Sequence, residues 1–323
     1  PCPYFGRCGG CDFQQLDYRA QLEAKVEMIR DCLRRIARLE PPAEIPIKPS
    51  PLEWRYRGRA QWQHDDVRKR IGYFERGSHR ICDIAECPVL MPELQSTLSG
   101  LRERMRNDSL PPTAEDFQAV AGDEGVSLAP SLDDEAPLEA SRVILESRYR
   151  FSAEGFFQIN QSLLPELVAY AIDDARGDTA VDLYCGVGLF TLPLARRFRQ
   201  VTGIEGNPSA VAYARRNLSE ARLENALIEC SPVGHWLNEN APAHAPVDLV
   251  LLDPPRTGLE EGATEGILAL RPQHITYVSC DPATLARDLR ELISGGYTLG
   301  PIAAFDMFPQ THHVETVVFL HQS

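Results

Sequence analysis

Residues 179–195 read TAVDLYCGVGLFTLPLA and indicate how the second half of the chain folds. An apolar strand runs into a glycine turn, and a helix follows at 190–198. Apolar strands continue to alternate with helices further along the chain, which is typical of a doubly wound α/β fold with a parallel sheet. The last two extended segments, 297–306 and 314–321, have only a short connection. We therefore expect them to form an antiparallel hairpin at the edge of that sheet.

Four stretches fall at the carboxyl ends of the expected strands, where ligands bind in sheets of this kind. They are DLYCGVG (182–188), IEGN (204–207), LLDPPR (251–256) and VSCDP (278–282). Gly186 lets the backbone approach a ligand, and Glu205 is suitably placed to accept hydrogen bonds from a ribose. The third glycine of the dinucleotide fingerprint is absent, because Leu189 follows the turn. This pattern and the edge hairpin favour a methyltransferase-type sheet over that of an NAD-dependent dehydrogenase.

Cys280 is the candidate nucleophile. It ends the strand ITYVSC and precedes Asp281 and Pro282 at the start of the next helix, whose dipole favours a thiolate. A buried, unreactive side chain is the commoner role of a cysteine. The position of Cys280 beside LLDPPR and opposite HVE favours the nucleophile. Four other cysteines are interpreted as ordinary core or turn residues: Cys32, Cys82, Cys185 and Cys230.

Composition bounds the class of protein. The 323 residues are enough for two or three domains, and no apolar run reaches the length of about 20 residues that a membrane span requires. Nine scattered cysteines and the lack of a secretory pattern at residue 1 favour a reducing compartment, so we expect the cytoplasm. The formal charge of −13 is uneven, because residues 1–106 carry +4 and the rest carries −17.

The N-terminal third has its own pattern. Residues 12–40 predict an amphipathic helix, which a cluster of prolines ends. From 54 to 63, basic residues alternate with apolar ones, and a strand pair is expected to turn near Asp65 and Asp66. The side chains that alternate on one face, Arg55, Arg57 and Arg59, favour contact with RNA phosphates or an ordinary solvated surface about equally. Residues 107–146 are acidic and predict a mobile insert or a small excursion containing strands.

Five motifs follow one another along most of the chain: FFQIN (156–160), DLYCGVGLFTLPLA (182–195), LLDPPRTGL (251–259), VSCDPATLARDL (278–289) and DMFPQTHHVETVV (306–318). In order and spacing they resemble the RNA 5-methyluridine methyltransferases of the RumA/TrmA type. The resemblance implies a Rossmann-like S-adenosylmethionine-dependent methyltransferase domain, with a mostly parallel seven-stranded sheet and an antiparallel edge hairpin. A smaller α+β iron-sulfur and RNA-binding module would precede it. We expect an iron-sulfur segment with a basic β module at 1–92, the remainder of a central α+β domain with an acidic insert at 93–150, and the methyltransferase domain at 151–323.

The same resemblance implies a mechanism. Cys280 would add to carbon 6 of a uracil in RNA, which makes carbon 5 nucleophilic enough to take a methyl group. Glu315, in the HVE stretch, would then remove the proton from carbon 5 as a general base. The residues implied to contact S-adenosylmethionine are Gln158, Tyr184, Gly186, Glu205 and Asp253. The target base has to leave any stack to reach Cys280, so base flipping or a single-stranded loop is expected.

The cysteines near the N-terminus also match the resemblance. Relatives of the RumA kind hold a four-iron four-sulfur cluster with a C-x5-C-x2-C pattern and a distant cysteine in a CPV context. Cys2, Cys8, Cys11 and Cys87 fit that pattern, with Cys82 as a rival for the last position. Zinc is the alternative on ligand type alone, because four thiolates also suit it. The spacing is not a repeated C-x2-C pair, so the cluster is favoured.

The resemblance leaves the RNA open. Ribosomal RNA, 23S in particular, is favoured over transfer RNA, since the transfer-RNA members generally lack the cluster ligands. We expect a monomer that does not bind a membrane. The alternative from another class is a metal-stabilised RNA-binding protein with a degenerate methyltransferase domain, which would bind RNA without turnover. The presence of both Cys280 and Glu315 argues against that alternative.

Overall fold

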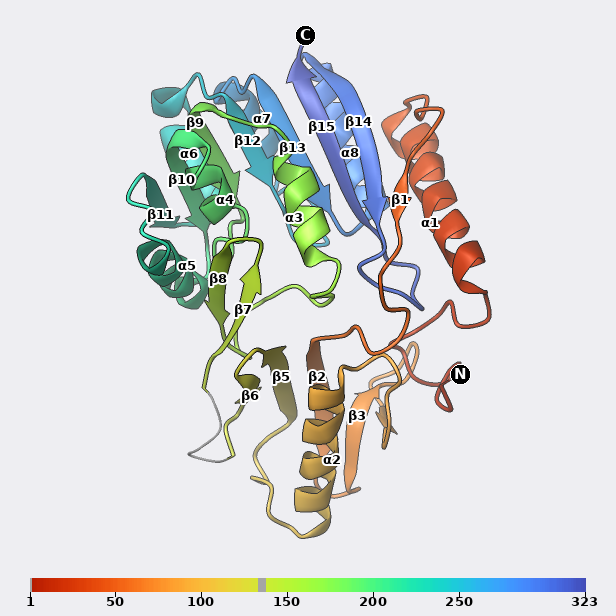
Figure 1. Cartoon of the computed structure of the whole chain (residues 1–323). Coiled ribbons are helices and arrows are strands. Elements are labelled where there is room, and N and C mark those ends of the chain that lie inside the picture. The colour runs from red at the N-terminus through yellow and green to blue at the C-terminus, as the bar shows by residue number, and fades with distance from the viewer. Residues whose placement is uncertain (1, 133–137) are drawn as a thin grey trace.

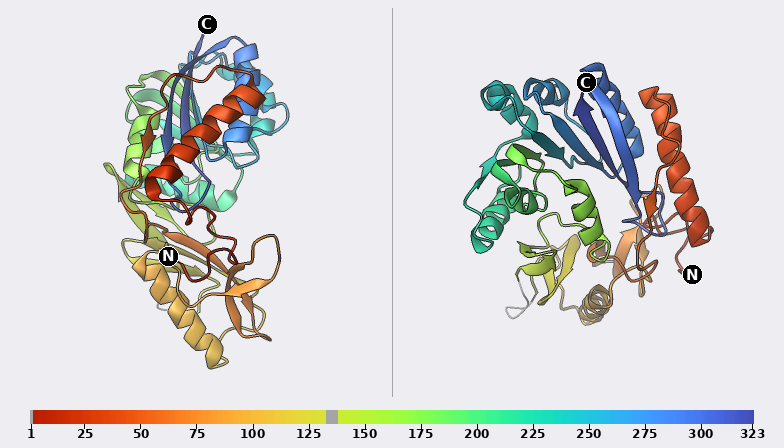
Figure 2. Two further views of the ribbon diagram at one scale, coloured as in Figure 1. Left: turned by 90° about the vertical axis from the view of Figure 1, so that its right-hand side faces the viewer. Right: turned by 45° about the horizontal axis from the view of Figure 1, so that its top comes forward.

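The computed structural model describes residues 2–132 and 138–323, and it divides into two parts that lie end to end (Figure 1). The larger part is built on an eight-stranded sheet with the order β1-β14-β15-β13-β12-β9-β10-β11. The smaller part holds a five-stranded sheet with the order β4-β3-β2-β5-β6. A two-stranded sheet, β7-β8, lies where the two parts meet (Figure 1). The N-terminus also lies near that junction (Figure 2).

The large sheet confirms the expected fold class. Its strands are β9 (Gly177–Leu183), β10 (Phe198–Glu205), β11 (Ala226–Cys230), β12 (Leu249–Leu252), β13 (His274–Ser279), β14 (Tyr297–Phe305) and β15 (Glu315–Gln322). All neighbouring pairs from β11 to β13 are parallel, and β15 is antiparallel to both β13 and β14. The hairpin of β14 and β15 was expected at the edge. An additional short strand, β1 (Ile47–Lys48), pairs with β14 in parallel and extends the sheet beyond the hairpin.

Helices cover both faces of this sheet (Figure 2). One face shares a hydrophobic core with α3 (Leu164–Ile172), α4 (Thr191–Ala195) and α5 (Pro208–Glu220). The other face shares a core with α1 (Tyr18–Cys32), α6 (Val233–His244), α7 (Ala263–Ala269) and α8 (Pro282–Ser294). The bounds of α8 agree with the sequence, because Asp281 caps its first turn and Pro282 occupies the first helical position.

The predicted amphipathic helix is present as α1, and it lies on the large sheet rather than on the basic strands. Its buried residues Ile29 and Leu33 belong to the core shared with α8. The helix ends in a π-helical turn, η1 (Leu33–Ala37), with Arg38 in the left-handed conformation. The expected unit 1–92 therefore contributes to both parts of the molecule. Its boundary at residue 92 and the one at 150 stay predictions.

The small sheet consists of β2 (Arg59–Asp65), β3 (Arg70–Phe74), β4 (Ile81–Asp83), β5 (Asp116–Gly122) and β6 (Gly125–Ala129). The turn between β2 and β3 confirms the strand pair expected near Asp65. A helix that was not predicted, α2 (Pro92–Arg106), packs on the sheet through a stripe of leucines and Met105.

Residues 107–146 are more closely integrated than the expected insert. β5 pairs with β2 on one side and β6 on the other, and Phe117 is fully buried in the core under α2. The hairpin of β7 (Ala140–Ile144) and β8 (Ser147–Phe151) then leads into the large part. Residues 133–137, in the acidic stretch, lie outside the described residues. No helix in the part of the chain that the structure describes is long and apolar enough to cross a membrane.

Candidate active site and cysteine site

Sheet register brings the two expected catalytic residues together. Strands β13 and β15 are antiparallel, and Ser279 lies opposite Thr316. Continued by one position, this register sets Cys280, just past β13, opposite Glu315, the first residue of β15, and the charge of Glu315 acts on the Cys280 thiol. Side chains directly opposite one another in an antiparallel pair lie on the same face, with Cβ atoms about 4.5–5.5 Å apart. A separation of 35 residues in sequence thus becomes a contact between neighbouring strand ends.

Asp253 completes this group of strand ends. It follows β12, and Leu252 at the end of β12 lies opposite Tyr277 of β13. The amide of Gln158, which is almost fully buried, reaches the Asp253 carboxylate with a distance of 3.4 Å between Nε2 and Oδ2. Four of the expected site residues therefore converge at the carboxyl edge of the large sheet, where parallel sheets bind their ligands.

Burial dominates the electrostatics of this group. It raises the pKa of the Cys280 thiol to about 12, and the charges of Glu315 and Asp253 act in the same direction. Burial and then Asp253 raise the pKa of Glu315 well above its ordinary value. The pKa of Asp253 is raised by burial to about 7. Arg256 is the positive charge that opposes these shifts at both Cys280 and Glu315.

Glu315 has a buried carboxylate oxygen that is not used in a structural hydrogen bond within the described residues. Its side chain is 2% exposed, and its Oε1 atom has no hydrogen-bond partner among the described residues. A buried, unpaired carboxylate oxygen costs free energy, and such groups cluster at functional sites. The structure thus supplies an acceptor next to the Cys280 thiol.

The glycine turn after β9 forms a second group of expected residues. Tyr184 and Gly186 both adopt left-handed backbone conformations, with φ of 62° and 56°. An added Cβ at Gly186 would find no atom within 4 Å, so the backbone there borders open space. The Glu205 carboxylate holds the turn, because it accepts hydrogen bonds from the backbone N–H groups of Gly186 (3.0 Å) and Asn207 (2.7 Å). Burial and then the charge of Glu260 raise the pKa of the Tyr184 hydroxyl.

Two residues near this edge were missed by the sequence analysis, although both lie inside motifs it singled out. Asp182 is fully buried at the end of β9, accepts a hydrogen bond from the Thr191 hydroxyl at 2.5 Å, and has its pKa raised by burial to about 8. Arg256 is the cation next to Cys280 and Glu315. Since catalytic sites mix carboxylates with a compensating charge, its place in LLDPPR was the available signal.

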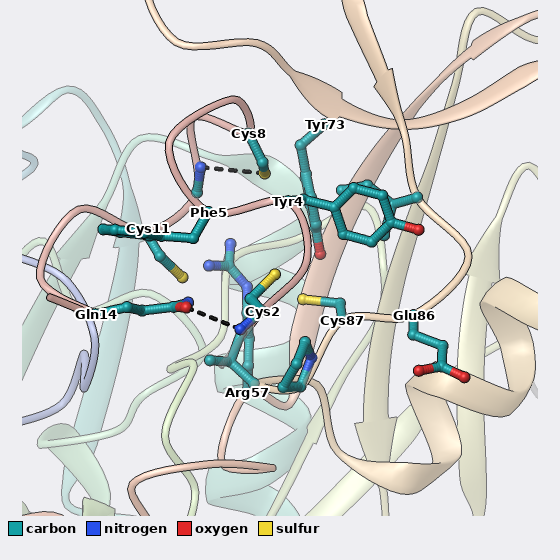
Figure 3. A pocket seen from close by; sticks show the side chains of 14 residues that line it. Cys2, Tyr4, Phe5, Cys8, Cys11, Gln14, Arg57, Tyr73, Glu86 and Cys87 are labelled. Carbon is teal, nitrogen blue, oxygen red and sulfur yellow. Dashed lines mark hydrogen bonds between the residues drawn. The ribbon is translucent and has the colours of Figure 1, made fainter.

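The four expected cluster cysteines line one cavity in the small part of the molecule (Figure 3). Cys2, Cys8 and Cys11 come from the N-terminal segment, and Cys87 comes from the loop before α2. Figure 3 shows their side chains around a common space, with Gln14 and Arg57 beside them. Burial raises the pKa of Cys8, Cys11 and Cys87 to about 11 in each case.

The expected iron-sulfur cluster and its zinc alternative both stay predictions. Within the described ranges, no group of three or more His, Cys, Asp or Glu side chains is arranged to hold a metal ion. The rival Cys82 is not among the cavity residues. It is buried in β4, where its sulfur accepts a hydrogen bond from Arg7 Nε at 3.2 Å.

The three arginines expected to form one basic face have separate surroundings. Arg55 is exposed. Arg57 lines the cysteine cavity, with its guanidinium 5.8 Å from the centre of the Tyr73 ring. Arg59 donates hydrogen bonds to the Gly155 carbonyl and to the Gln118 side chain. The expected alternation with buried residues is present, and of the three arginines Arg55 is the exposed one. Contact of the three with RNA stays a prediction.

The remaining cysteines differ from one another. Cys185 is buried in the turn after β9, as expected for a residue whose backbone matters most. Cys32 is half-buried beside the core of α1, whereas Cys230 is exposed at the end of β11.

Comparison with known proteins agrees with this geometry. A model of the tRNA (uracil-5-)-methyltransferase family matches residues 138–231 and 243–323. The 23S rRNA (uracil(1939)-C(5))-methyltransferase RlmD of Thiobacillus denitrificans is 34% identical, over 99% of this chain and 85% of the relative. The RlmD protein of Vibrio parahaemolyticus is 31% identical, over 100% of this chain and 82% of the relative.

A solved structure is also similar. It is Pyrococcus abyssi tRNA (uracil-54, C5)-methyltransferase in complex with S-adenosyl-L-homocysteine, with a TM-score of 0.77 and 27% identity over 96% of this chain and 85% of that one. The family match covers more than half of the residues, and the similarity to the RlmD proteins spans nearly the whole chain. The chain therefore belongs to the tRNA (uracil-5-)-methyltransferase family and is an S-adenosylmethionine-dependent enzyme of that family.

Proposed function

We propose that this enzyme methylates carbon 5 of a uridine in 23S ribosomal RNA, through a covalent bond between Cys280 and carbon 6 of the base. The observation that carries the proposal is the placement of Cys280 and Glu315 at neighbouring strand ends, close enough for the charges of Glu315, Asp253 and Arg256 to act on the Cys280 thiol. Carbon 5 of uracil is a poor nucleophile until a nucleophile adds at carbon 6. A thiol and a general base on the same face of the sheet are the two groups that this route needs.

Cys280 acts as the nucleophile in its thiolate form. When its sulfur adds to carbon 6, the electron pair of the 5,6 double bond moves toward carbon 5 and the 4-carbonyl oxygen. Because the free thiol has a pKa near 12, formation of the thiolate is costly in the absence of substrate. Arg256 lowers that cost, since its charge favours an anion at Cys280.

Glu315 then removes the proton from carbon 5 after methylation. Loss of this proton restores the 5,6 double bond and expels the Cys280 thiolate, so the enzyme is regenerated. A carboxylate whose pKa is raised by burial is a stronger base than an exposed glutamate. The unpaired Oε1 atom is the acceptor available for this proton.

The cofactor contacts are proposed for Gln158, Tyr184, Gly186, Glu205 and Asp253. S-adenosylmethionine supplies the methyl group. The open space beside the Gly186 backbone supports a ligand at this turn. The Glu205 carboxylate accepts hydrogen bonds from two backbone N–H groups. A carboxylate has further lone pairs, which can accept hydrogen bonds from ribose hydroxyls.

For the cavity in the small part we propose a four-iron four-sulfur cluster bound by Cys2, Cys8, Cys11 and Cys87. Its support is the set of four cysteines that line one cavity. Bound there, the cluster ties the N-terminal segment to the loop before α2. Methyl transfer needs no electron, so this role is structural.

Ribosomal RNA is proposed as the substrate because similarity to two RlmD proteins spans nearly the whole chain. Transfer RNA is the second candidate, since the similar solved structure is a tRNA (uracil-54, C5)-methyltransferase. Contact of Arg55, Arg57 and Arg59 with RNA, a monomeric state and a cytoplasmic location stay predictions.

The test uses 5-fluorouridine in ribosomal RNA, with S-adenosylmethionine and protein prepared without oxygen. Fluorine at carbon 5 cannot leave as a proton, so the enzyme and RNA should remain joined in a denaturing gel. We expect the adduct with the wild-type enzyme and none with Cys280→Ala, and mapping of the attached nucleotide gives the uridine. Matched transfer RNA in the same assay decides between the two substrates.

Two results would contradict the proposal. An adduct that survives in Cys280→Ala would assign the nucleophile elsewhere. RNA binding without an adduct on either RNA, in protein that retains iron and binds S-adenosylmethionine, would favour the non-catalytic RNA-binding protein.

A further inference from the structure

The loop that leads to Glu315 is unusual because it is almost entirely buried. It consists of residues 306–314, between the end of β14 and the start of β15. Asp306, Met307 and Val314 are fully buried, and Gln310 is 3% exposed. Loops between strands normally run over the surface, because their backbone groups need partners. The partners of this loop come from the other end of the chain.

Helix α1 supplies the first set of partners. Its buried stripe is apolar at Ile29, over the large sheet, but polar at Gln21 and Lys25. Lys25 Nζ donates to Asp306 Oδ1 at 2.5 Å and to the Phe308 carbonyl at 3.0 Å. Both members of this ion pair are fully buried, so it holds the start of the loop in one place.

Gln21 binds the middle of the loop with both atoms of its amide. Its Oε1 atom accepts from the Gln310 backbone N–H at 2.9 Å, and its Nε2 atom donates to Gln310 Oε1 at 3.1 Å. Gln310 has a φ of 70°, in the left-handed region that a residue with a side chain rarely adopts. The two bonds from Gln21 and the surrounding contacts therefore hold a backbone conformation that is unfavourable by itself.

The N-terminal cysteine segment supplies the second set. The backbone N–H groups of Asp12 and Phe13 donate to the Gln310 carbonyl at 3.1 and 3.0 Å. The Asp12 carboxylate accepts from the His312 backbone N–H at 2.8 Å and pairs with the His312 ring. Asp12 directly follows the cavity residue Cys11. Hydrogen bonds of Asp12 thus connect the segment next to the cysteine cavity with His312, three residues before Glu315.

We propose that Asp12, Gln21 and Lys25 are positioning residues for Glu315, which clamp residues 306–314 and thereby set where the catalytic carboxylate lies. The inference rests on the proposed function of Glu315. Proton removal needs the carboxylate within hydrogen-bond reach of carbon 5, and a misplacement of 1 Å can cost on the order of 100-fold in rate. Addition of Cys280 to carbon 6 does not use the loop, because Cys280 directly follows β13.

Because proton removal depends on the loop and thiol addition does not, a positioning role predicts a result that a purely structural role does not predict. If Glu315 is displaced, the methylated base stays joined to Cys280 and the covalent adduct with ordinary uridine accumulates. If a variant is merely less stable, adduct and product fall together. The ratio of trapped adduct to released product therefore separates the two roles.

The test compares Gln21→Ala with wild type, Glu315→Gln and the matched control Arg19→Ala. Arg19 is on the same helix but exposed, where it pairs with Glu23. For Gln21→Ala we expect product release to slow by about tenfold or more, with adduct formation little changed. Arg19→Ala should behave as wild type, and Glu315→Gln should show the largest adduct fraction. Lys25→Met with Asp306→Leu removes the ion pair without leaving one buried charge, and it should also raise the adduct fraction.

Hydrogen exchange of the amides in 306–314 provides the readout that is independent of catalysis. Gln21→Ala should increase exchange there, whereas Arg19→Ala should not. An unchanged adduct ratio in Gln21→Ala, or equal losses of adduct and product, would overturn the clamp. Wild-type protein that yields neither adduct nor product would instead reject the proposed function, and unchanged exchange in Gln21→Ala would then still reject the clamp.

Discussion

Cys280 and the four cysteines of the N-terminal cavity are all partly buried, but different kinds of structure hold them. Cys280 follows a strand in the middle of an eight-stranded sheet, and regular pairing places Glu315 opposite it. The cavity cysteines lie in turns and loops, where their neighbours are Arg57 and Tyr73. The backbone alone builds the first site. The second has four partly buried cysteines around a space, so we expect it to depend on the group that it binds.

The largest expected effect tests the contrast between the two sites directly. Cys87→Ser should remove the iron, from about four atoms per chain to near zero, and should lower the melting temperature, because metal-binding free energy contributes to folding. Cys280→Ala should keep the iron and melt close to wild type, since a sheet made by backbone pairing does not need that thiol. Iron analysis and thermal unfolding of anaerobic protein measure both.

The exposed Cys230 provides the control for that experiment, because Cys230→Ser removes a thiol without touching either site. If Cys280→Ala destabilised the protein as much as Cys87→Ser, the contrast between the two sites would be wrong. Iron that survives in Cys87→Ser would remove that residue from the ligand set.

The next largest effect concerns the pH dependence of stability that arises from the buried carboxyl group of Asp182. The pKa of Asp182 is raised from an ordinary value of 3.8 to about 8 in the folded protein. Below pH 4 both states are protonated and its stabilising contribution is complete. As the pH rises from 4 to 8 the unfolded chain ionises first, so the free energy of unfolding falls by up to about 1.4 kcal/mol per pH unit.

Asp182→Asn keeps a hydrogen-bond acceptor for Thr191 but cannot ionise. Its stability should therefore be flatter across this pH range, which urea unfolding of both proteins at pH 5, 6, 7 and 8 will show. Parallel curves for the two proteins would mean that Asp182 is already ionised in the folded state.

The smallest effect compares two glycines, one from each site. Gly186 and Gly6 both have positive φ, 56° and 86°, and at both an added Cβ would meet nothing within 4 Å. Alanine at either position should cost about 1–2 kcal/mol of stability from backbone strain alone. Only Gly186→Ala should weaken binding of S-adenosylhomocysteine, by several-fold in calorimetry, because its Cβ would enter the space proposed for the cofactor. Equal affinities in the two variants would place the cofactor elsewhere.

The two sites also differ in how far the sequence could predict them. Residues 278–294 gave the strand end and α8 correctly, because an Asp-Pro cap and a periodic leucine pattern are local signals. The contact of Cys280 with Glu315 depends on antiparallel pairing, which the sequence supplied only through the expected hairpin and the family resemblance. Register is a property of two strands together, and only the structure shows it.

Other features were missed for identifiable reasons. The stripe of α2, Leu94, Leu98, Leu101 and Met105, has helical spacing and was available in the sequence. By contrast, strand β1 has two residues and exists only because β14 is beside it. The alternation of Arg57 and Arg59 with buried residues was identified correctly, although β2 begins only at Arg59. The cavity that Arg57 lines and the Gly155 carbonyl that Arg59 contacts come from distant segments.

The clamp between α1 and the last hairpin has a consequence for how the molecule is made. Lys25 and Asp306 are separated by 281 residues, and Gln21 and Gln310 by 289. At synthesis rates of about 5–20 residues per second, the N-terminal segment waits roughly 15–60 s for the residues that bury it. During that time the thiols of Cys2, Cys8 and Cys11 are open to solvent. Of the residues in this chain, those synthesised first are thus among the last to reach their final place.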